Sequence, residues 1–269
     1  MRDTHRYVGI AILTQVTAVV LFLSWLLPPT SGLWQFLDEA TFRALNGSLR
    51  QGSPASHFWG WLNIRAADLI PAVLLYALAV SAAGRMVQPQ RMQFIHRGLA
   101  LIVVMLAVIT AENAIQYGLF SYHRASPTLV MSDVVRLSHD VPAAKDFSPK
   151  SFPGDHGYVL VCIAVFFALA ASRRVALVAA AIAVLFTLPR LIAGAHWMTD
   201  IVIGSVGKTL LTTGWLLATP LWDRLAGAIE RGLSRLPINP VRLVCDWWWG
   251  SDTAEYPVAD PQQEIHRAA

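Results

Sequence analysis

The sequence is poor in charged residues and in cysteine, and both shortages exclude classes of protein. Of 269 residues only 14% are charged and 55% are hydrophobic, whereas a soluble domain carries about 25% charged residues. The chain is therefore too apolar for water and is expected to be an integral membrane protein. Its two cysteines, one inside an apolar segment and one near the C-terminus, do not make a disulfide framework.

The small excess of positive charge lacks the pattern of a nucleic-acid-binding surface. Lysine and arginine total 21 against 17 acidic residues, a net charge of +4. The basic residues flank apolar segments, where they meet lipid headgroups, and no basic patch with interleaved aromatics lies elsewhere. We therefore expect membrane lipids as partners and no nucleic acid. The spacing of zinc ligands is also missing.

Long apolar runs are abundant, and they predict the fold. About 20 apolar residues cross a bilayer as a helix, which satisfies its own backbone hydrogen bonds in lipid. We expect an all-α integral membrane protein whose first run is retained as a span, because it is longer than a signal-peptide core. The six predicted transmembrane helices are 7–27, 66–84, 97–120, 156–172, 174–195 and 199–219.

Arginines predict the orientation of these spans. The N-terminus, the second-to-third and fourth-to-fifth connections and the segment after the sixth span all carry arginine. The positive-inside rule places them, and both termini, in the cytoplasm. The longer connections 28–65 and 121–155 then lie on the opposite side, although they too contain basic residues, so the rule favours this orientation without forcing it.

The remaining segments complete the predicted organisation. Residues 1–219 form the six-helix membrane domain, 220–250 an amphipathic and aromatic cytoplasmic segment, and 251–269 a polar tail expected to be disordered. Between the first two spans, apolar residues from 33 to 45 recur at near-helical spacing and predict a short helix in the membrane interface. A plain structured loop is the alternative.

Polar side chains gather at span ends on the side opposite the cytoplasm. Arg124 follows the third span, His156 opens the fourth, Arg190 and His196 close the fifth, and Asp200 starts the sixth. Charged groups within spans are costly and indicate function. Their convergence on one membrane face indicates a single site.

These residue types suit phosphoryl transfer. His196 and Asp200 are four apart, so on a helix the carboxylate can hold one imidazole nitrogen and leave the other as a nucleophile. Arg124 and Arg190 offer planar forks of donors to phosphate, and His156 can act as general acid. We expect no metal or other cofactor, because no acidic cluster suggests magnesium.

The stretch "SFPGDHG" and its neighbours add weaker candidates. Gly154, at the start of a helix, would let backbone N–H groups approach a phosphate. Asp155 either belongs to the site or caps the helix, and Lys150 is either a phosphate ligand or a solvated loop charge. Arg65 and Asp68, at helical spacing, are expected to pair with each other.

Three motifs carry a resemblance to a known family. "RASP" from Arg124, "SFPGDH" ending at His156, and R-x5-H-x3-D from Arg190 to Asp200 resemble the signatures of the type 2 phosphatidic acid phosphatase superfamily. The usual forms are K-x6-R-P, P-S-G-H and S-R-x5-H-x3-D. The third motif matches best in spacing.

The departures from the usual motifs leave open which residue replaces the lysine of the first motif. Pro189 and Gly154 replace serines of the third and second motifs, and Tyr117 stands where the first motif has its lysine. One phosphate-binding cation is therefore missing. Lys150 and His123 are the candidates to replace it.

The segments "GLWQFLDEATFRALN", "HRASPTL", "SFPGDHG" and "GAHWMTDIVIGS" together resemble a bacterial family of lipid A phosphotransferases. The resemblance implies undecaprenyl diphosphate as donor and the 1-phosphate of Kdo2-lipid A as acceptor, at the periplasmic face of the inner membrane. It also implies a phosphohistidine at His196, orientation by Asp200, acid–base work by His156, and phosphate binding by Arg124 and Arg190. The alternatives are a lipid phosphatase and a non-enzymatic lipid-binding or transport protein.

Overall fold

The computed structural model describes residues 4–118 and 123–250, and every regular element among them is a helix. The predicted tail, 251–269, and the end of the predicted third span lie outside the described residues. The elements are α1 (Thr4–Leu26), α2 (Thr30–Asn46), α3 (Pro54–Leu62), η1 (Arg65–Asp68), α4 (Leu69–Gly84), α5 (Gln88–Gly118), α6 (Pro127–Val130), α7 (Leu137–Asp140), α8 (Asp155–Ala170), α9 (Arg173–Ile192), η2 (Asp200–Val206), α10 (Gly207–Ala218), α11 (Leu221–Ser234) and α12 (Pro240–Trp249).

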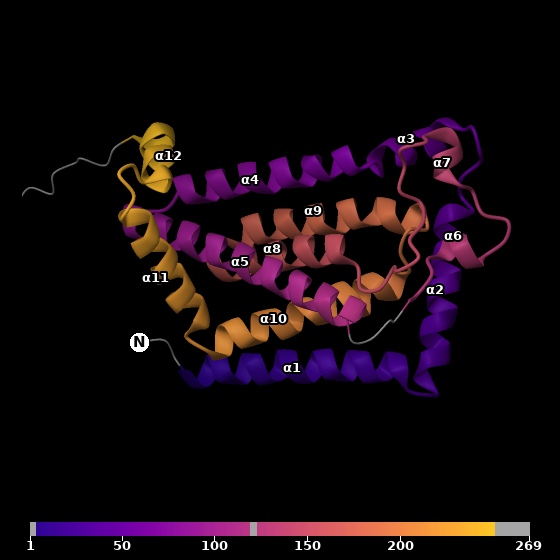
Figure 1. Ribbon diagram of the computed structural model, residues 1–269, viewed down its shortest axis with the longest axis horizontal. Helices are drawn as coiled ribbons and strands as arrows, with labels where there is room; N and C mark the ends of the chain where they lie inside the picture. The colour runs from indigo at the N-terminus through magenta and orange to yellow at the C-terminus, as the bar shows by residue number, and fades with distance from the viewer. Residues whose placement is uncertain (1–3, 119–122, 251–269) are drawn as a thin grey trace, which may run out of the picture.

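The long helices form one bundle. Helices α1, α4, α5, α8, α9 and α10 run along the long axis of the molecule (Figure 1), with α1 packed on α10 and α8 on α9. Small buried residues such as Ala82, Ala100 and Ala179 let neighbouring helices approach closely. Large apolar side chains, among them Val73 and Val184, point outward, as expected of a surface that contacts lipid.

The helix lengths confirm a multi-pass membrane protein but only part of the predicted topology. Four helices are long and apolar enough to cross a membrane, and a fifth span is added if the pair 200–217 and 221–234, bent by 76°, counts as one. Helix α8 falls short at 16 residues. It ends early because Ser172 already caps α9, accepting a hydrogen bond from the Val175 N–H.

Two predicted spans begin irregularly. The second starts with η1, a 3-10 turn, before α4. The sixth starts as the π-helix η2, where the Ser205 hydroxyl donates to the carbonyls of Gly154, at 2.7 Å, and Asp200, at 3.2 Å. Single π-turns are frequent at functional sites, and both irregular starts lie at the same end of the bundle.

Helix α2 occupies the segment in which a short helix is predicted, and it is longer than expected. It lies across the ends of the bundle helices (Figure 1) and buries Asp38, Phe42 and Asn46. The Asn46 amide donates to the carbonyl of Ile192, at the end of α9, at 3.0 Å. Its location at a membrane surface stays a prediction. At the opposite end of the molecule, α11 and α12 form the predicted amphipathic and aromatic segment.

Candidate active site

The three sequence motifs meet where α9 ends and where α8 and η2 begin (Figure 1). Backbone hydrogen bonds join them. The Ser151 N–H donates to the carbonyl of Arg124 at 2.8 Å, which ties the first motif to the second. The Gly154 N–H donates to the carbonyl of Asp200 at 3.2 Å, which ties the second motif to the third. The predicted convergence of these segments is therefore present.

His196 is held by a backbone carbonyl more closely than by its predicted partner. Its Nδ1 lies 2.7 Å from the Ser151 carbonyl oxygen and 3.5 Å from Oδ2 of Asp200. A carbonyl can only accept, so Nδ1 carries the proton and Nε2 keeps the lone pair. Asp200 is fully buried, and its Oδ2 also accepts from the Trp197 N–H at 2.8 Å, which fixes the turn that carries His196.

Arg124 is surrounded by protein acceptors. Its Nη1 donates to Oδ1 of Asp200 at 2.6 Å and to the Thr199 hydroxyl at 2.7 Å, and its Nη2 donates to Oδ2 of Asp38 at 2.6 Å. The guanidinium also lies 5.5 Å from the ring centre of Trp25. The structure thus places Arg124 behind Asp200, where it holds the carboxylate next to His196.

Arg190 and His156 share a second carboxylate, that of Asp68. Nη2 of Arg190 donates to both Asp68 oxygens, at 2.7 and 2.9 Å, and Nη1 donates to Oδ1 of Asn63 at 2.7 Å. Nδ1 of His156 lies 3.7 Å from Oδ1 of Asp68, and its Nε2 lies 3.2 Å from the Phe186 carbonyl. The prediction that Asp68 pairs with Arg65 is therefore wrong, because the Arg190 fork reaches Asp68 from α9.

The two histidines belong to one electrostatic environment. His156 interacts with the charges of Asp68, Arg190 and His196. Asp68 is 40% exposed, whereas Arg190 is nearly buried. The solvent-accessible side of the site is thus the side where the Asp68 carboxylate binds the guanidinium of Arg190.

The weaker candidates serve packing and charge balance in this structure. A Cβ on Gly157 would lie 2.5 Å from Oγ of Ser205, and one on Gly154 would lie 3.1 Å from it, so these glycines allow α8 and η2 to touch. Oδ1 of Asp155 accepts from Nζ of Lys208 at 2.7 Å. Lys208 also bonds Glu112, and Lys150 interacts electrostatically with Glu112.

Three polar residues beside the motifs, Asp38, Asn63 and Lys145, have no role in the sequence-based prediction, and Asp68 is predicted there only as the partner of Arg65. Asp38 and Asn63 are buried. Both stand among aromatic and apolar neighbours in the sequence, and this is the one signal of their burial that the sequence offers. Lys145 interacts with the charges of Arg190 and Asp68, so its ammonium group lies within electrostatic reach of the site.

An apolar groove starts at the site. A cavity of about 330 Å³ has Asp68 and His156 at its polar end and continues between α4, α5 and α8. Its walls are formed by apolar residues that include Leu75, Ile102 and Phe166. A chain of hydrocarbon in this groove would place a polar headgroup at His156.

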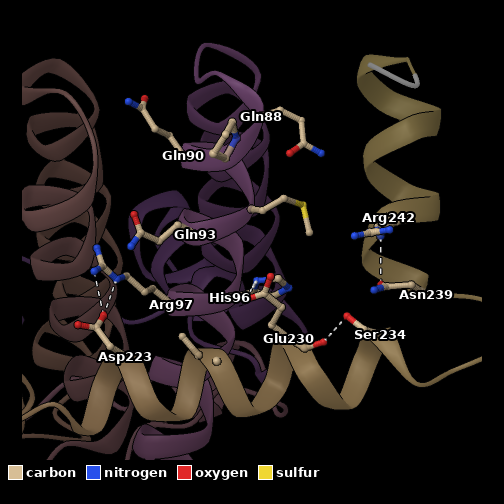
Figure 2. Close-up of a pocket in the computed structure, with 14 residues that line it drawn as sticks. Gln88, Gln90, Gln93, His96, Arg97, Asp223, Glu230, Ser234, Asn239 and Arg242 are labelled. Atoms are coloured by element: carbon tan, nitrogen blue, oxygen red, sulfur yellow. Dashed lines mark hydrogen bonds and ion pairs between the residues drawn. The ribbon is translucent and has the colours of Figure 1, made fainter. Parts of the chain in front are cut away.

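A separate polar pocket of about 580 Å³ lies at the other end of the molecule, between α5, α11 and α12 (Figure 2). Arg97 pairs there with Asp223, with Nη2 2.8 Å from Oδ1. None of the motif residues lines this pocket, so the chemistry argued from the motifs belongs to the first end.

Comparison with known proteins decides the family. Residues 97–224 match the model of the PAP2 superfamily. The chain is 34% identical over 224 residues to the lipid A 1-diphosphate synthase of Escherichia coli (strain K12), covering 82% of this chain and 92% of the relative. The chain belongs to the PAP2 superfamily. It is an enzyme of the phosphatase and phosphotransferase type, as the resemblance predicts. No solved structure matches it.

Proposed function

We propose that the enzyme transfers a phosphoryl group from undecaprenyl diphosphate to the 1-phosphate of Kdo2-lipid A. The proposal is carried by two histidines in different roles: His196, whose Nδ1 is held by the Ser151 carbonyl so that Nε2 can attack, and His156, which stands with the Arg190-bound Asp68 at the polar end of an apolar groove. The name of the similar E. coli protein, lipid A 1-diphosphate synthase, supports the acceptor.

In the first half-reaction, Nε2 of His196 attacks the terminal phosphorus of the donor. The bond from that phosphorus to the bridging oxygen breaks, a P–N bond forms, and undecaprenyl phosphate leaves. His156 supplies a proton to the departing oxygen from Nδ1, because its Nε2 faces the Phe186 carbonyl. Splitting the transfer through a covalent histidine replaces one difficult step by two easier ones.

In the second half-reaction, an oxygen of the acceptor phosphate attacks the phosphohistidine. The P–N bond breaks, lipid A 1-diphosphate forms, and His156 accepts the proton that the acceptor loses. Arg190 neutralises the equatorial oxygens in both steps, with phosphate taking the place of the Asp68 carboxylate in its fork. Arg124 acts indirectly, because it holds the Asp200 carboxylate.

The proposed topology has six spans, with α8 and α10 joining the four long apolar helices. Both termini lie in the cytoplasm of a bacterium, α2 lies in the outer interface of the inner membrane, and the site faces the periplasm. Single-cysteine variants in a background without Cys162 and Cys245 test this arrangement. An impermeant maleimide should label Ser132→Cys in intact spheroplasts and leave Arg235→Cys unlabelled, and the reverse pattern would invert the topology.

The transfer itself is tested with purified enzyme and undecaprenyl diphosphate labelled in its terminal phosphate. Label should move to Kdo2-lipid A when this acceptor is present and should stay on the donor with His196→Ala. Release of label only as inorganic phosphate would make the enzyme a phosphatase. Binding of both lipids with no turnover would make the protein a lipid binder.

A further inference from the structure

Two cationic side chains share a cavity beside the candidate active site. This cavity, of about 570 Å³, lies between the start of η1 and residues 143–149 of the connection to α8. Arg65 and Lys145 line it, and among the described residues neither makes a hydrogen bond or an ion pair through its charged group. Both residues are exposed, so an anion from the solvent can reach the two cations and reduce their mutual repulsion.

The cavity is tied to the site through one buried residue. The Lys145 N–H donates to the carbonyl of Asn63 at 3.0 Å, and the Asn63 amide donates to the carbonyl of Lys145. Asn63 also accepts from Nη1 of Arg190, through its carbonyl at 3.1 Å and its side chain at 2.7 Å. The backbone of Lys145 and the guanidinium of Arg190 are therefore anchored to the same residue.

Arg65 is joined to the site by the geometry of η1. In a 3-10 helix, side chains three residues apart lie on the same side. Arg65 and Asp68 are the first and last residues of η1, and Asp68 lies in the Arg190 fork. The same turn thus carries Asp68 to the reacting position and Arg65 to the neighbouring cavity.

The proposed function needs two phosphates side by side. The donor is a diphosphate, of which one phosphate is transferred and the other leaves, and the acceptor brings a phosphate that becomes linked to the transferred group. Because the covalent histidine separates the two half-reactions, the departing and the incoming phosphate can use the same place in turn. Water needs no such place, so a second subsite would favour transfer over hydrolysis.

We propose that Arg65 and Lys145 form a second phosphate subsite, which binds the phosphate that His196 does not attack. The inference rests on the proposed function and extends it. The ligand chemistry is a phosphate ester of a lipid, supplied by the donor in the first half-reaction and by the acceptor in the second. The paired cations hold it next to the phosphoryl group in the Arg190 fork.

Binding of non-hydrolysable ligands tests the subsite without turnover. Purified wild-type enzyme should bind methylene diphosphonate roughly tenfold more tightly than methylphosphonate, since the second phosphonate gains charge-assisted hydrogen bonds. Arg65→Gln/Lys145→Gln should bring this ratio close to one and leave the affinity for methylphosphonate unchanged. Arg50→Gln, an exposed arginine in the loop after α2, is the matched control and should keep the wild-type ratio.

Conservative variants separate a lost subsite from a misfolded protein. Arg65→Lys/Lys145→Arg keeps both charges and should keep most of the preference. An unchanged ratio in the Gln/Gln variant, or equal affinities in the wild type, would overturn the subsite.

Single-turnover kinetics then distinguish the two sources of the phosphate. Slower formation of phosphohistidine from labelled undecaprenyl diphosphate in the Gln/Gln variant identifies the donor, and a roughly tenfold fall in the ratio of transfer to hydrolysis identifies the acceptor. If the wild type shows the diphosphonate preference but releases label only to water, the subsite stands and the proposed transfer fails.

Discussion

Two clusters of arginine, aspartate and histidine flank the site, and they differ in exposure. In the first, Arg124 binds Asp200, which lies beside His196, and both carboxylates around this arginine are almost completely buried. In the second, Arg190 binds Asp68, which lies beside His156, and this carboxylate is 40% exposed. The carboxylates are thus buried in the first cluster and open to solvent in the second, whereas Arg124, at 18% exposed, is more accessible than Arg190, at 5%.

The difference separates positioning from binding. A buried ion pair with further hydrogen bonds keeps its partners fixed, because losing either partner leaves an unpaired charge in the interior. An exposed carboxylate in an arginine fork can be exchanged for another anion at little cost. The difference supports the proposal that the Arg124 cluster orients the nucleophile and that the Arg190 cluster receives the phosphate.

The largest expected effect comes from the nucleophile. His196→Gln should lower turnover on the order of a thousandfold or more, because the covalent route is lost. Radiolabelled donor consumption measures the loss. His139→Gln, an exposed histidine in the same connection as Lys145, should turn over at the wild-type rate, and a similar loss in that control would point to misfolding.

The next effect contrasts the stability of the two clusters. Asp38→Asn removes one partner of a buried pair and should destabilise the fold by about 3–5 kcal/mol. Asp68→Asn changes an exposed pair and should cost about 1 kcal/mol or less. Thermal unfolding of the detergent-solubilised variants compares them. Equal losses would mean that the exposed cluster is as structural as the buried one.

A smaller effect is expected from the groove that leads to the open cluster. Ala79→Trp fills a lining position on α4 and should raise KM for undecaprenyl diphosphate roughly tenfold, with little effect on a short-chain diphosphate. Val73→Trp, exposed on the same helix and outside the groove, is the control. An equal change in KM for long and short donors would show that the groove does not hold the chain.

The smallest expected effect is a pH dependence of phosphonate binding in the subsite that Arg65 and Lys145 form. Burial lowers the pKa of Lys145 below its usual value near 10.5, and the charges of Arg190 and Arg65 lower it further, against the opposing charges of Asp68 and Asp155. A bound phosphonate raises this pKa again, so binding takes up a proton in the alkaline range.

The affinity for methylene diphosphonate should therefore be full below the lowered pKa and fall a few-fold as the pH rises through it towards 10.5. Titration at pH 7 to 10.5 measures the fall. Lys145→Arg stays charged over this range and supplies the baseline for the titration of the ligand itself. If the affinity falls with pH equally in the wild type and in Lys145→Arg, Lys145 does not belong to the subsite.

The sequence predicts the Arg124 cluster better than the Arg190 cluster. The spacing of His196 and Asp200 and the span ends that carry Arg124 and Arg190 are local features, so counting along the chain finds them. Asp68 and Asn63 meet Arg190 only through contacts 122 and 127 residues apart, which no local pattern encodes.

The same limit explains the misassigned partners. Lys145 stands in an irregular loop, and its place is fixed by backbone bonds to Asn63, 82 residues earlier. The carbonyl that holds His196 comes from Ser151, 45 residues earlier. Because every residue has a backbone carbonyl, the residue type does not indicate this contact. The π-helical start η2 is likewise accompanied by tertiary hydrogen bonds to Gly154, which hydropathy does not encode.

One measurement tests the central claim most directly. The enzyme is mixed with undecaprenyl diphosphate labelled in its terminal phosphate, without acceptor, quenched in alkali and digested for mass spectrometry of the histidine peptides. Phosphate on His196, discharged when Kdo2-lipid A is added before the quench, is the predicted result. Phosphate on His156, or transfer to lipid A without any phosphohistidine at position 196, would contradict the assignment of the two clusters.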